Sequence, residues 1–149
     1  MSLTAVYGIL RDPSHVEGLV DSLRQQGYRS RDISLLLAPV VNLGPVFREI
    51  ARSVWPVGIR ALAFPGVGPL IGAGPIMNYF AEEGVENRVA GSLVRKLAGI
   101  GITENHAKRL ARCIKSGGLL LSVRCSNNLG TKRVMKLLKQ TGAEEIWAT

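Results

Sequence analysis

Aromatic residues and cysteines are scarce in this 149-residue chain, and each shortage excludes a class of protein. Aromatic side chains make up 5% of the sequence, and the predicted strands lack the paired aromatics on which an RNA-recognition sheet stacks bases. The two cysteines, Cys113 and Cys125, end a predicted helix and the following predicted strand, too far apart for a disulfide. We interpret both as free thiols in a reducing compartment, which excludes a disulfide-rich fold.

Residues with the spacing of a metal or catalytic site are also missing. His15 and His106 each lie near the start of a predicted helix without a cysteine or histidine at ligand spacing, and we expect surface or capping roles. Glu82, Glu83 and Glu86 are interpreted as a solvated helix face. No Ser/His/Asp or Cys/His set stands out. The sequence therefore predicts a non-enzymatic protein with no metal and no cofactor.

Charge is absent from residues 61–81, which are rich in glycine and proline. The run is long enough to cross a bilayer, but its prolines and glycines would leave backbone groups without partners in lipid. Its glycines lack the spacing of a dinucleotide fingerprint, and no Lys-Ser/Thr pair follows them as in a nucleotide-binding loop. We interpret the glycines as sites of close backbone packing, between helices or between subunits.

Burial of this charge-free run calls for a partner, because so long an apolar stretch should not stay exposed on a monomer. We therefore predict a homo-oligomer, with a dimer favoured, and keep membrane contact as a less favoured alternative. The candidate interface residues are Phe64, Pro65, Gly66, Gly68, Pro69, Ile71, Gly72, Gly74 and Pro75. The N-terminus shows no signal-peptide pattern, which favours a cytoplasmic protein with peripheral membrane association as the alternative.

Hydrophobic periodicity predicts an α+β fold of one domain, residues 1–149. Two strand–helix–strand units are expected, because the helix ends at 19–27 and 134–142 share a pattern of leucine, base, glutamine and glycine. This repeat predicts a ferredoxin-like two-layer sandwich of two βαβ units with both helices on one face of the sheet. A helical, Gly/Pro-rich insertion is expected over residues 42–102. The predicted strands are 3–10, 33–37, 119–125 and 144–148, and the predicted insertion helices are 46–55 and about 76–98.

Several motifs resemble one known family. Residues 61–69 (ALAFPGVGP) and 72–75 (GAGP) resemble the Ala-x-Pro-Gly-x-Gly-Pro…Ala-Gly-Pro signature of bacterial general-stress and low-temperature-induced proteins. Residues 99–104 (GIGITE) and 116–123 (SGGLLLSV) are similar to its Gly-Ile-Pro-Glu and Gly-Gly-x-Leu-x-x-Val elements. These motifs are structural, so the resemblance implies a stress-associated protein without an established chemistry. The helix at 108–112 is basic where the family's is rich in glutamate and tyrosine, and the insertion is shorter than in many relatives.

Basic residues are concentrated in one part of the chain. Residues 103–139 contain nine basic side chains and the single acid Glu104, so the net charge of +8 resides in two predicted helices and the strand between them. If the helices are neighbours, they form one positive surface that attracts nucleic acid or an acidic membrane. The alternative is a pair of solvated helix faces. The candidate anion-binding residues are Lys108, Arg109, Arg112, Lys115, Lys132, Arg133, Lys136 and Lys139.

Three functions follow from these patterns. The leading hypothesis is a non-enzymatic stress-associated protein that acts by self-association and partner contact. The second is an anion-binding module that uses the basic helices. The third, a small-molecule sensor, rests on analogy with the fold alone.

Overall fold

The computed structural model describes residues 4–39, 48, 52, 54–55, 59–81 and 92–149. Within these residues the chain is an α+β structure with one antiparallel six-stranded sheet and five helices. The strands are β1 (Thr4–Leu10), β2 (Ile33–Leu37), β3 (Arg60–Phe64), β4 (Gly68–Ala73), β5 (Leu119–Cys125) and β6 (Glu144–Ala148). The helices are α1 (Pro13–Gln25), α3 (Pro75–Ala81), α4 (Leu93–Gly99), α5 (Glu104–Lys115) and α6 (Asn128–Gln140).

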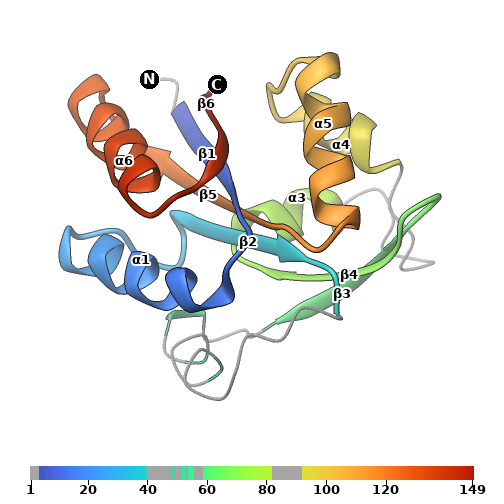
Figure 1. Cartoon of the computed structure of the whole chain (residues 1–149), viewed down its shortest axis with the longest axis horizontal. Helices are drawn as coiled ribbons and strands as arrows, with labels where there is room; N and C mark the ends of the chain where they lie inside the picture. The colour runs from blue at the N-terminus through green and yellow to red at the C-terminus, as the bar shows by residue number, and fades with distance from the viewer. Residues whose placement is uncertain (1–3, 40–47, 49–51, 53, 56–58, 82–91) are drawn as a thin grey trace.

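The sheet has the strand order β3-β4-β2-β5-β1-β6, and each neighbouring pair is antiparallel (Figure 1). The four strands predicted from the sequence, β1, β2, β5 and β6, are adjacent at one end of this order. The chain enters the sheet through β1, which lies between β5 and β6. Strand β4 pairs with the free side of β2, and β3 pairs with β4 to form the far edge.

Helices α1, α5 and α6 each begin at a residue whose side chain caps the helix N-terminus. The side chain of Asp12 accepts a hydrogen bond from the backbone N–H of the second residue after it, and the side chains of Thr103 and Asn127 cap α5 and α6 by accepting from the third residue after each. Such caps satisfy backbone donors that have no partner within the helix. Gly27 and Gly142 follow α1 and α6 with φ values of 95° and 87°, a conformation that glycine adopts without strain. The predicted helix ends at 19–27 and 134–142 are confirmed at these two glycines.

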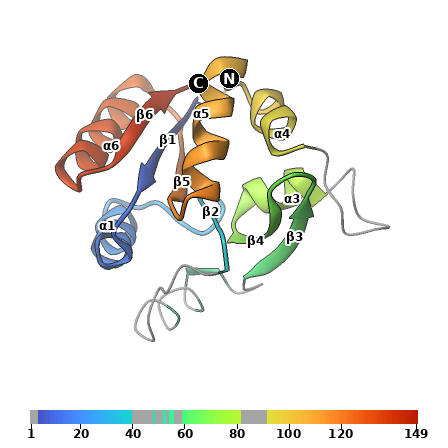
Figure 2. The ribbon, with the colours of Figure 1, turned by 45° about the vertical axis from the view of Figure 1, so that its right-hand side comes forward.

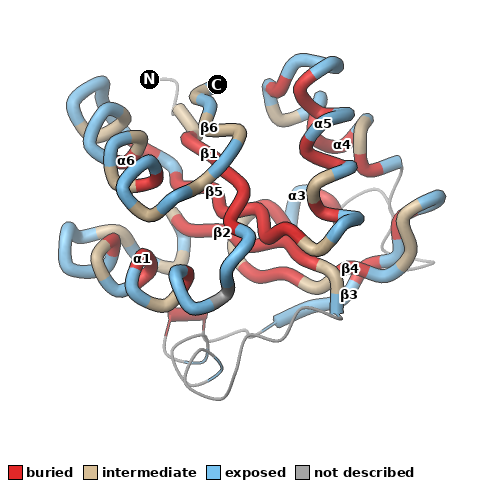
Figure 3. Tube along the Cα trace, in the orientation of Figure 1, coloured by how far each residue is buried: buried red, intermediate tan, exposed pale blue. Residues whose placement is uncertain are grey.

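Helices cover both faces of the sheet. Helices α1 and α6 pack on one face, here named the α1–α6 face, and α3, α4 and α5 pack on the other, named the α5 face (Figures 1 and 2). Because successive side chains of a strand point to opposite faces, Val6 and Leu121 belong to the first core while Tyr7 and Leu120 belong to the second. The central strands are consequently buried on both sides (Figure 3).

The insertion is not wholly helical, which corrects the prediction for residues 42–102. Arg60–Phe64 and Gly68–Ala73 form a hairpin that extends the sheet. Strand β3 alternates in burial, since Ala61 and Ala63 are exposed whereas Leu62 and Phe64 are buried. This period of two is the pattern of a half-buried strand, and the density of glycine and proline around it concealed the signal.

The glycines of the run serve two purposes. Gly66 and Gly68 have φ values of 79° and 97° at the hairpin turn and have open space around them. Gly72 and Gly74 lie against the backbone of β2, where a Cβ atom would collide with Leu35 and Ile33. Gly72 and Gly74 are therefore sites of close backbone packing, but against a neighbouring strand rather than between helices or subunits as predicted, and turn geometry explains the other two.

Parts of the predicted insertion lie outside the described residues. Most of the predicted helix 46–55 is among them, as is the middle of the predicted helix 76–98, whose two ends are α3 and α4. The acidic residues Glu82, Glu83 and Glu86 also fall there. In the ranges that the structure describes, no helix has the length and apolar character needed to span a membrane.

Candidate functional site

The predicted anion-binding residues are divided between the two faces of the sheet. Helix α5, with four of them, packs on the α5 face, and α6, with the other four, packs on the opposite face (Figure 2). The sheet lies between the two helices, so they do not form the single positive surface that the sequence analysis considered. Each helix presents its own surface.

The cations of α5 are largely engaged within the chain. Arg109 donates a 2.7 Å hydrogen bond to Glu145, and Lys108 lies 3.5 Å from Glu104 one turn earlier on the helix. The ammonium group of Lys115 donates to the carbonyl oxygen of Gly66 at 3.4 Å, which links α5 to the β3–β4 turn. A shallow pocket of about 390 Å³ lies here. It is lined by Gly66, Val67, Val94, Lys108, Ala111, Arg112 and Lys115.

The cations of α6 have a different environment. Lys132, Arg133, Lys136 and Lys139 are exposed, and none forms an ion pair with a carboxylate of the described chain. Within the part of the chain that the structure describes, their charges are therefore not neutralised by carboxylates. Because α6 buries only its apolar stripe, including Val134 and Leu138, the basic side chains occupy the side of the helix that faces solvent.

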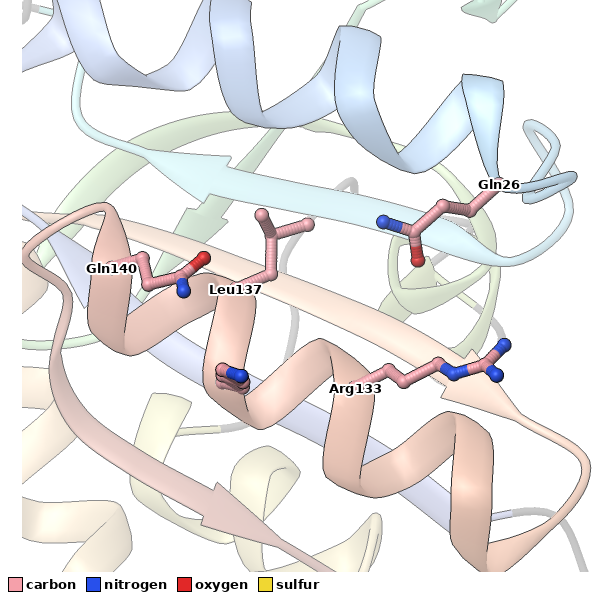
Figure 4. A pocket seen from close by; sticks show the side chains of 5 residues that line it. Gln26, Arg133, Leu137 and Gln140 are labelled. Carbon is pink, nitrogen blue, oxygen red and sulfur yellow. The ribbon is translucent and has the colours of Figure 1, made fainter.

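A groove runs between the end of α1 and the outer side of α6 (Figure 4). Its volume is about 480 Å³, and it is lined by Gln26, Arg133, Lys136, Leu137 and Gln140. Leu137 lies between the two glutamines in Figure 4, and the side chain of Arg133 extends toward the Gln26 end. The lining therefore combines two cations and two amides with one apolar side chain, and it contains no carboxylate. We name it the α6 groove.

A second hollow adjoins the α6 groove and shares Gln26 with it. This hollow of about 280 Å³ is lined by Gln26, Gly27, Tyr28, Asp32, Arg124 and Ser126. Burial raises the pKa of Tyr28 to about 12, with its hydrogen bond to Cys125 as the next cause. Burial likewise raises the pKa of the Cys125 thiol. Both groups are therefore protonated near neutral pH, and neither is an activated nucleophile.

A buried polar chain joins three distant segments on the α5 face. The hydroxyl of Tyr7 on β1 lies 2.9 Å from Nδ1 of His106 on α5, and Nε2 of His106 lies 2.9 Å from Glu145 on β6. Arg109 donates to the other carboxylate oxygen of Glu145. The ring of Trp147 meets the ring of His106 edge-on, with centroids 5.2 Å apart. The expected surface or capping role of His106 is wrong, since its side chain is buried inside this chain of contacts.

The pKa shifts of Glu145 and Tyr7 determine the charge states of these two groups in the polar chain. Burial raises the pKa of Glu145, but the hydrogen bonds from Arg109 and His106 outweigh it and hold that pKa below its usual value. The carboxylate is therefore ionised at neutral pH and accepts from Nε2–H of His106. Burial, followed by the charge of Glu145, raises the pKa of Tyr7 well above its usual value, so the phenol keeps its proton while it is hydrogen-bonded to Nδ1 of His106.

The polar chain has the hydroxyl, imidazole and carboxylate groups of a catalytic relay in the same order. Unlike a catalytic relay, however, it is buried away from any substrate. Tyr7 is only 2% exposed, and Tyr7, His106 and Glu145 line none of the three pockets described above. A nucleophile must reach its substrate, and Tyr7 does not. We therefore assign the polar chain a structural role, in which it fastens β6 to α5 and β1.

Backbone geometry at Glu145 supports this role. The pairing of β6 with β1 shifts register between Tyr7 and Ile9, which marks a bulge, and Glu145 lies there with a φ value of 54°. A side chain at positive φ is strained, and such positions persist where surrounding contacts hold them. The hydrogen bonds from His106 and Arg109 hold Glu145 in place.

The predicted interface residues have mixed environments. Phe64 and Gly72 are buried within the chain, Ile71, Gly68, Gly74 and Pro75 are half-buried, and Pro65, Gly66 and Pro69 are exposed. The large apolar side chains of the run, such as Leu70 and Phe80, pack into the core of the α5 face. The chain thus buries most of this run by itself, and its apolar composition is no longer an argument for a second subunit.

The remaining sequence predictions concern single residues. His15 is exposed near Asp12, as expected. Cys113 and Cys125 are both free thiols, which confirms that they form no disulfide with each other. Across the described residues no cluster of histidine, cysteine and carboxylate side chains has the arrangement of a metal site.

Four residues of these sites were not among the predicted site residues: Tyr7, Glu145, Gln26 and Gln140. Tyr7 and Glu145 are separated by most of the chain, and only the strand pairing brings them together. Gln140 had a signal, because it is the glutamine of the second copy of the repeated helix end, but that pattern was used for the fold alone, and Gln26 corresponds to Thr141 in the repeat.

Comparisons with protein-family models, with curated proteins and with solved structures returned no match. The resemblance to general-stress proteins therefore stays a prediction from the motifs.

Proposed function

We propose that this chain is a non-catalytic binding protein that holds a phosphate-bearing anion in the α6 groove. The observation that carries the proposal is the contrast between the two basic helices. The cations of α5 are mostly engaged by the fold, whereas Arg133 and Lys136 have no carboxylate partner among the described residues and line a groove with two glutamines.

The chemistry of the groove suits a phosphate group. A guanidinium group offers paired donors to phosphate oxygens, an ammonium adds a mobile positive charge, and the amides of Gln26 and Gln140 add neutral donors. Leu137 provides an apolar contact between them. With no carboxylate in the lining, the groove repels no anion.

Shape favours the backbone of a single-stranded nucleic acid over an acidic membrane. A groove accepts a chain of phosphates, whereas a flat bilayer would contact the exposed side of α6. The basic helices lie on opposite faces, so a membrane reaches only one of them at a time. Backbone contact without aromatic stacking implies weak dependence on base sequence.

The terminal units support one further inference about the fold. Strands β6, β1, β5 and β2 lie in that order with antiparallel pairing, and α1 and α6 share one core. We infer that these units form a ferredoxin-like arrangement of two βαβ units. Within it, the outer sides of α1 and α6 face solvent and leave the groove accessible.

The test is fluorescence anisotropy with a labelled single-stranded oligonucleotide across a range of salt concentrations. The double variant Arg133→Glu/Lys136→Glu should weaken binding about tenfold or more. It should also lower the slope of log affinity against log salt by about 1.4, because each phosphate contact contributes about 0.7 for single strands.

A matched control is available on the same helix. Lys132→Glu/Lys139→Glu makes the same change in net charge at residues that do not line the groove, and should weaken binding only about two- to threefold through the long-range field. Equal losses in the two double variants would contradict a groove. Binding to phosphatidylserine vesicles but not to the oligonucleotide would instead support the membrane alternative.

A further inference from the structure

The two edges of the sheet differ in how they are protected. Strand β6 carries the bulge at Glu145, and its first residue Glu144 pairs with Arg11 at 3.1 Å. Bulges and charges on an edge strand hinder pairing with another chain. Strand β3, at the other edge, is regular across its five pairs with β4, and Arg60 at its start is its one charged residue.

Pro69 determines which backbone groups of β3 face outward. Pro69 pairs with Ala63, and it has no N–H to exchange in a hydrogen-bonded pair. Ala63 and Pro69 are therefore a non-hydrogen-bonded pair, and by alternation Leu62 bonds to β4. Ala61 and Ala63 consequently direct their N–H and C=O groups away from β4, toward the open edge. The missing donor of Pro69 costs nothing in the sheet, because β2 pairs with β4 only at Ile71–Ala73.

The side chains of the outward-facing positions leave room for another strand. Ala61 and Ala63 are exposed and small, and no residue from Ala61 to Phe64 carries a charge. Arg60, the one charged residue of β3, donates a 2.7 Å hydrogen bond to Asn78 on α3. The charge of Arg60 is thereby held beside α3, at the start of β3. Within the described residues, no strand lies beyond β3.

We infer that two copies of this chain pair through β3, antiparallel and about a two-fold axis, to form one continuous sheet. A second copy is the occupant that fits, because an uncharged edge of alternating alanines is complementary to itself when reversed. The added pair repeats the antiparallel pairing of every other neighbour in the sheet. This edge, rather than the buried apolar side chains of the run, is the interface.

The register follows from matching the outward groups. Centring the axis on Leu62 overlaps the whole strand and places Ala61 of one copy opposite Ala63 of the other. Both residues present N–H and C=O groups, so these two pairs exchange four hydrogen bonds. Arg60 then lies opposite Phe64 of the other copy, and the two Arg60 charges lie at opposite ends of the interface.

The first test is light scattering after size exclusion. The unmodified chain should elute with twice the mass of one chain, and Ala63→Pro should shift the equilibrium at least tenfold toward monomer, because it removes an outward donor that β4 does not use. A matched pair of lysine variants provides the control, because a proline in α4 would break that helix. Ala98→Lys changes an exposed alanine of α4, and Ala63→Lys changes an exposed alanine of β3. Only the second should weaken the dimer. A monomer at every concentration, or a dimer unaffected by both changes at position 63, overturns the inference.

A second measurement remains decisive if Ala63→Pro fails to fold. Ala61→Cys and Ala63→Cys chains are prepared separately and mixed under mild oxidation. Paired residues lie about 5.5 Å apart at Cα, within disulfide reach, so a cross-linked dimer should form in the mixture at least tenfold faster than in either variant alone. The unmodified chain, with Cys113 and Cys125 only, provides the background. No preferential cross-link in the mixture overturns the proposed pairing.

Discussion

The two faces of the sheet are built on different principles. The α1–α6 face is closed by an apolar core, and the basic side chains of α6 remain unpaired at the surface within the described chain. The α5 face contains all four buried polar or charged residues of the described ranges, among them Ser34, His106 and Ser122. Its basic helix is linked to β6 and to the β3–β4 turn.

The register of the central strands explains this difference. Tyr7 pairs with Ser122, and Ser122 pairs with Ser34, so the three polar side chains form one row across β1, β5 and β2. Their neighbours along each strand, such as Val6 and Leu121, point to the other face. This row forms hydrogen bonds with the helices that pack on the α5 face. Tyr7 bonds His106 on α5, and Ser34 accepts from the backbone N–H of Ile76 at the start of α3. The α5 face is therefore internally connected, while the cations of α6 on the other face have no carboxylate partner among the described residues.

The largest expected effect is a difference in the free energy of unfolding between variants of two adjacent residues of β5. Leu121 is fully buried in the core of the α1–α6 face, so Leu121→Ala should reduce the free energy of unfolding by about 3–5 kcal/mol through lost contacts and a cavity. Ser122→Ala, on the α5 face, should cost about 1 kcal/mol or less. Urea denaturation of both variants measures the difference. Equal losses would contradict the view that the first face depends mainly on apolar packing.

A smaller effect is expected for the polar chain of the α5 face. Tyr7→Phe and His106→Phe should each lower the free energy of unfolding by about 1–3 kcal/mol, because each leaves a buried polar group without its partner. The double variant should lose less than the sum, with a coupling energy of about 0.5–3 kcal/mol in urea unfolding.

The control for this cycle is an exposed tyrosine. Tyr79 is 39% exposed, and Tyr79→Phe should change stability by no more than about 0.5 kcal/mol. If the losses at Tyr7 and His106 are strictly additive, the two side chains do not act as a unit, and the polar chain does not fasten β6 as we describe.

The terminal units were predictable because local signals and tertiary structure agree there. The strands at Ile33–Leu37 and Leu119–Cys125 have the predicted bounds, and the caps at Asp12 and Thr103 are contacts within a few residues. Such signals depend on short-range chemistry that a sequence displays directly. The repeated helix ends also identified α1 and α6 as equivalent helices, which the shared core of the α1–α6 face is consistent with.

The hairpin and the polar chain could not be predicted for two different reasons. In the hairpin, the alternation of Ala61 to Phe64 is only four residues long, and the surrounding glycines and prolines favour loops. In the polar chain, the contact of His106 with Glu145 depends on the β1–β6 pairing and its bulge. A histidine near the start of a helix gives no sign of a carboxylate 39 residues later.

The smallest effect is a pH dependence specific to the α5 face. Glu145 has a pKa held below its usual value of 4.5, so its contribution to stability is complete above that value and is lost as the pH falls through the lower, folded-state pKa. Glu145→Gln should therefore be less stable than the unmodified chain near pH 7, and the gap should narrow as the pH falls below about 4.5. Urea unfolding of both chains across this range measures the gap. Tyr7, His106 and Arg109 are the other ionisable groups in this polar chain, and repeating the comparison with His106→Phe in both chains shows how much of the gap depends on the imidazole. A gap that is constant with pH would show that the charge of Glu145 does not hold β6 to α5. Any loss of stability in Glu145→Gln would then come from the different shape of the glutamine amide.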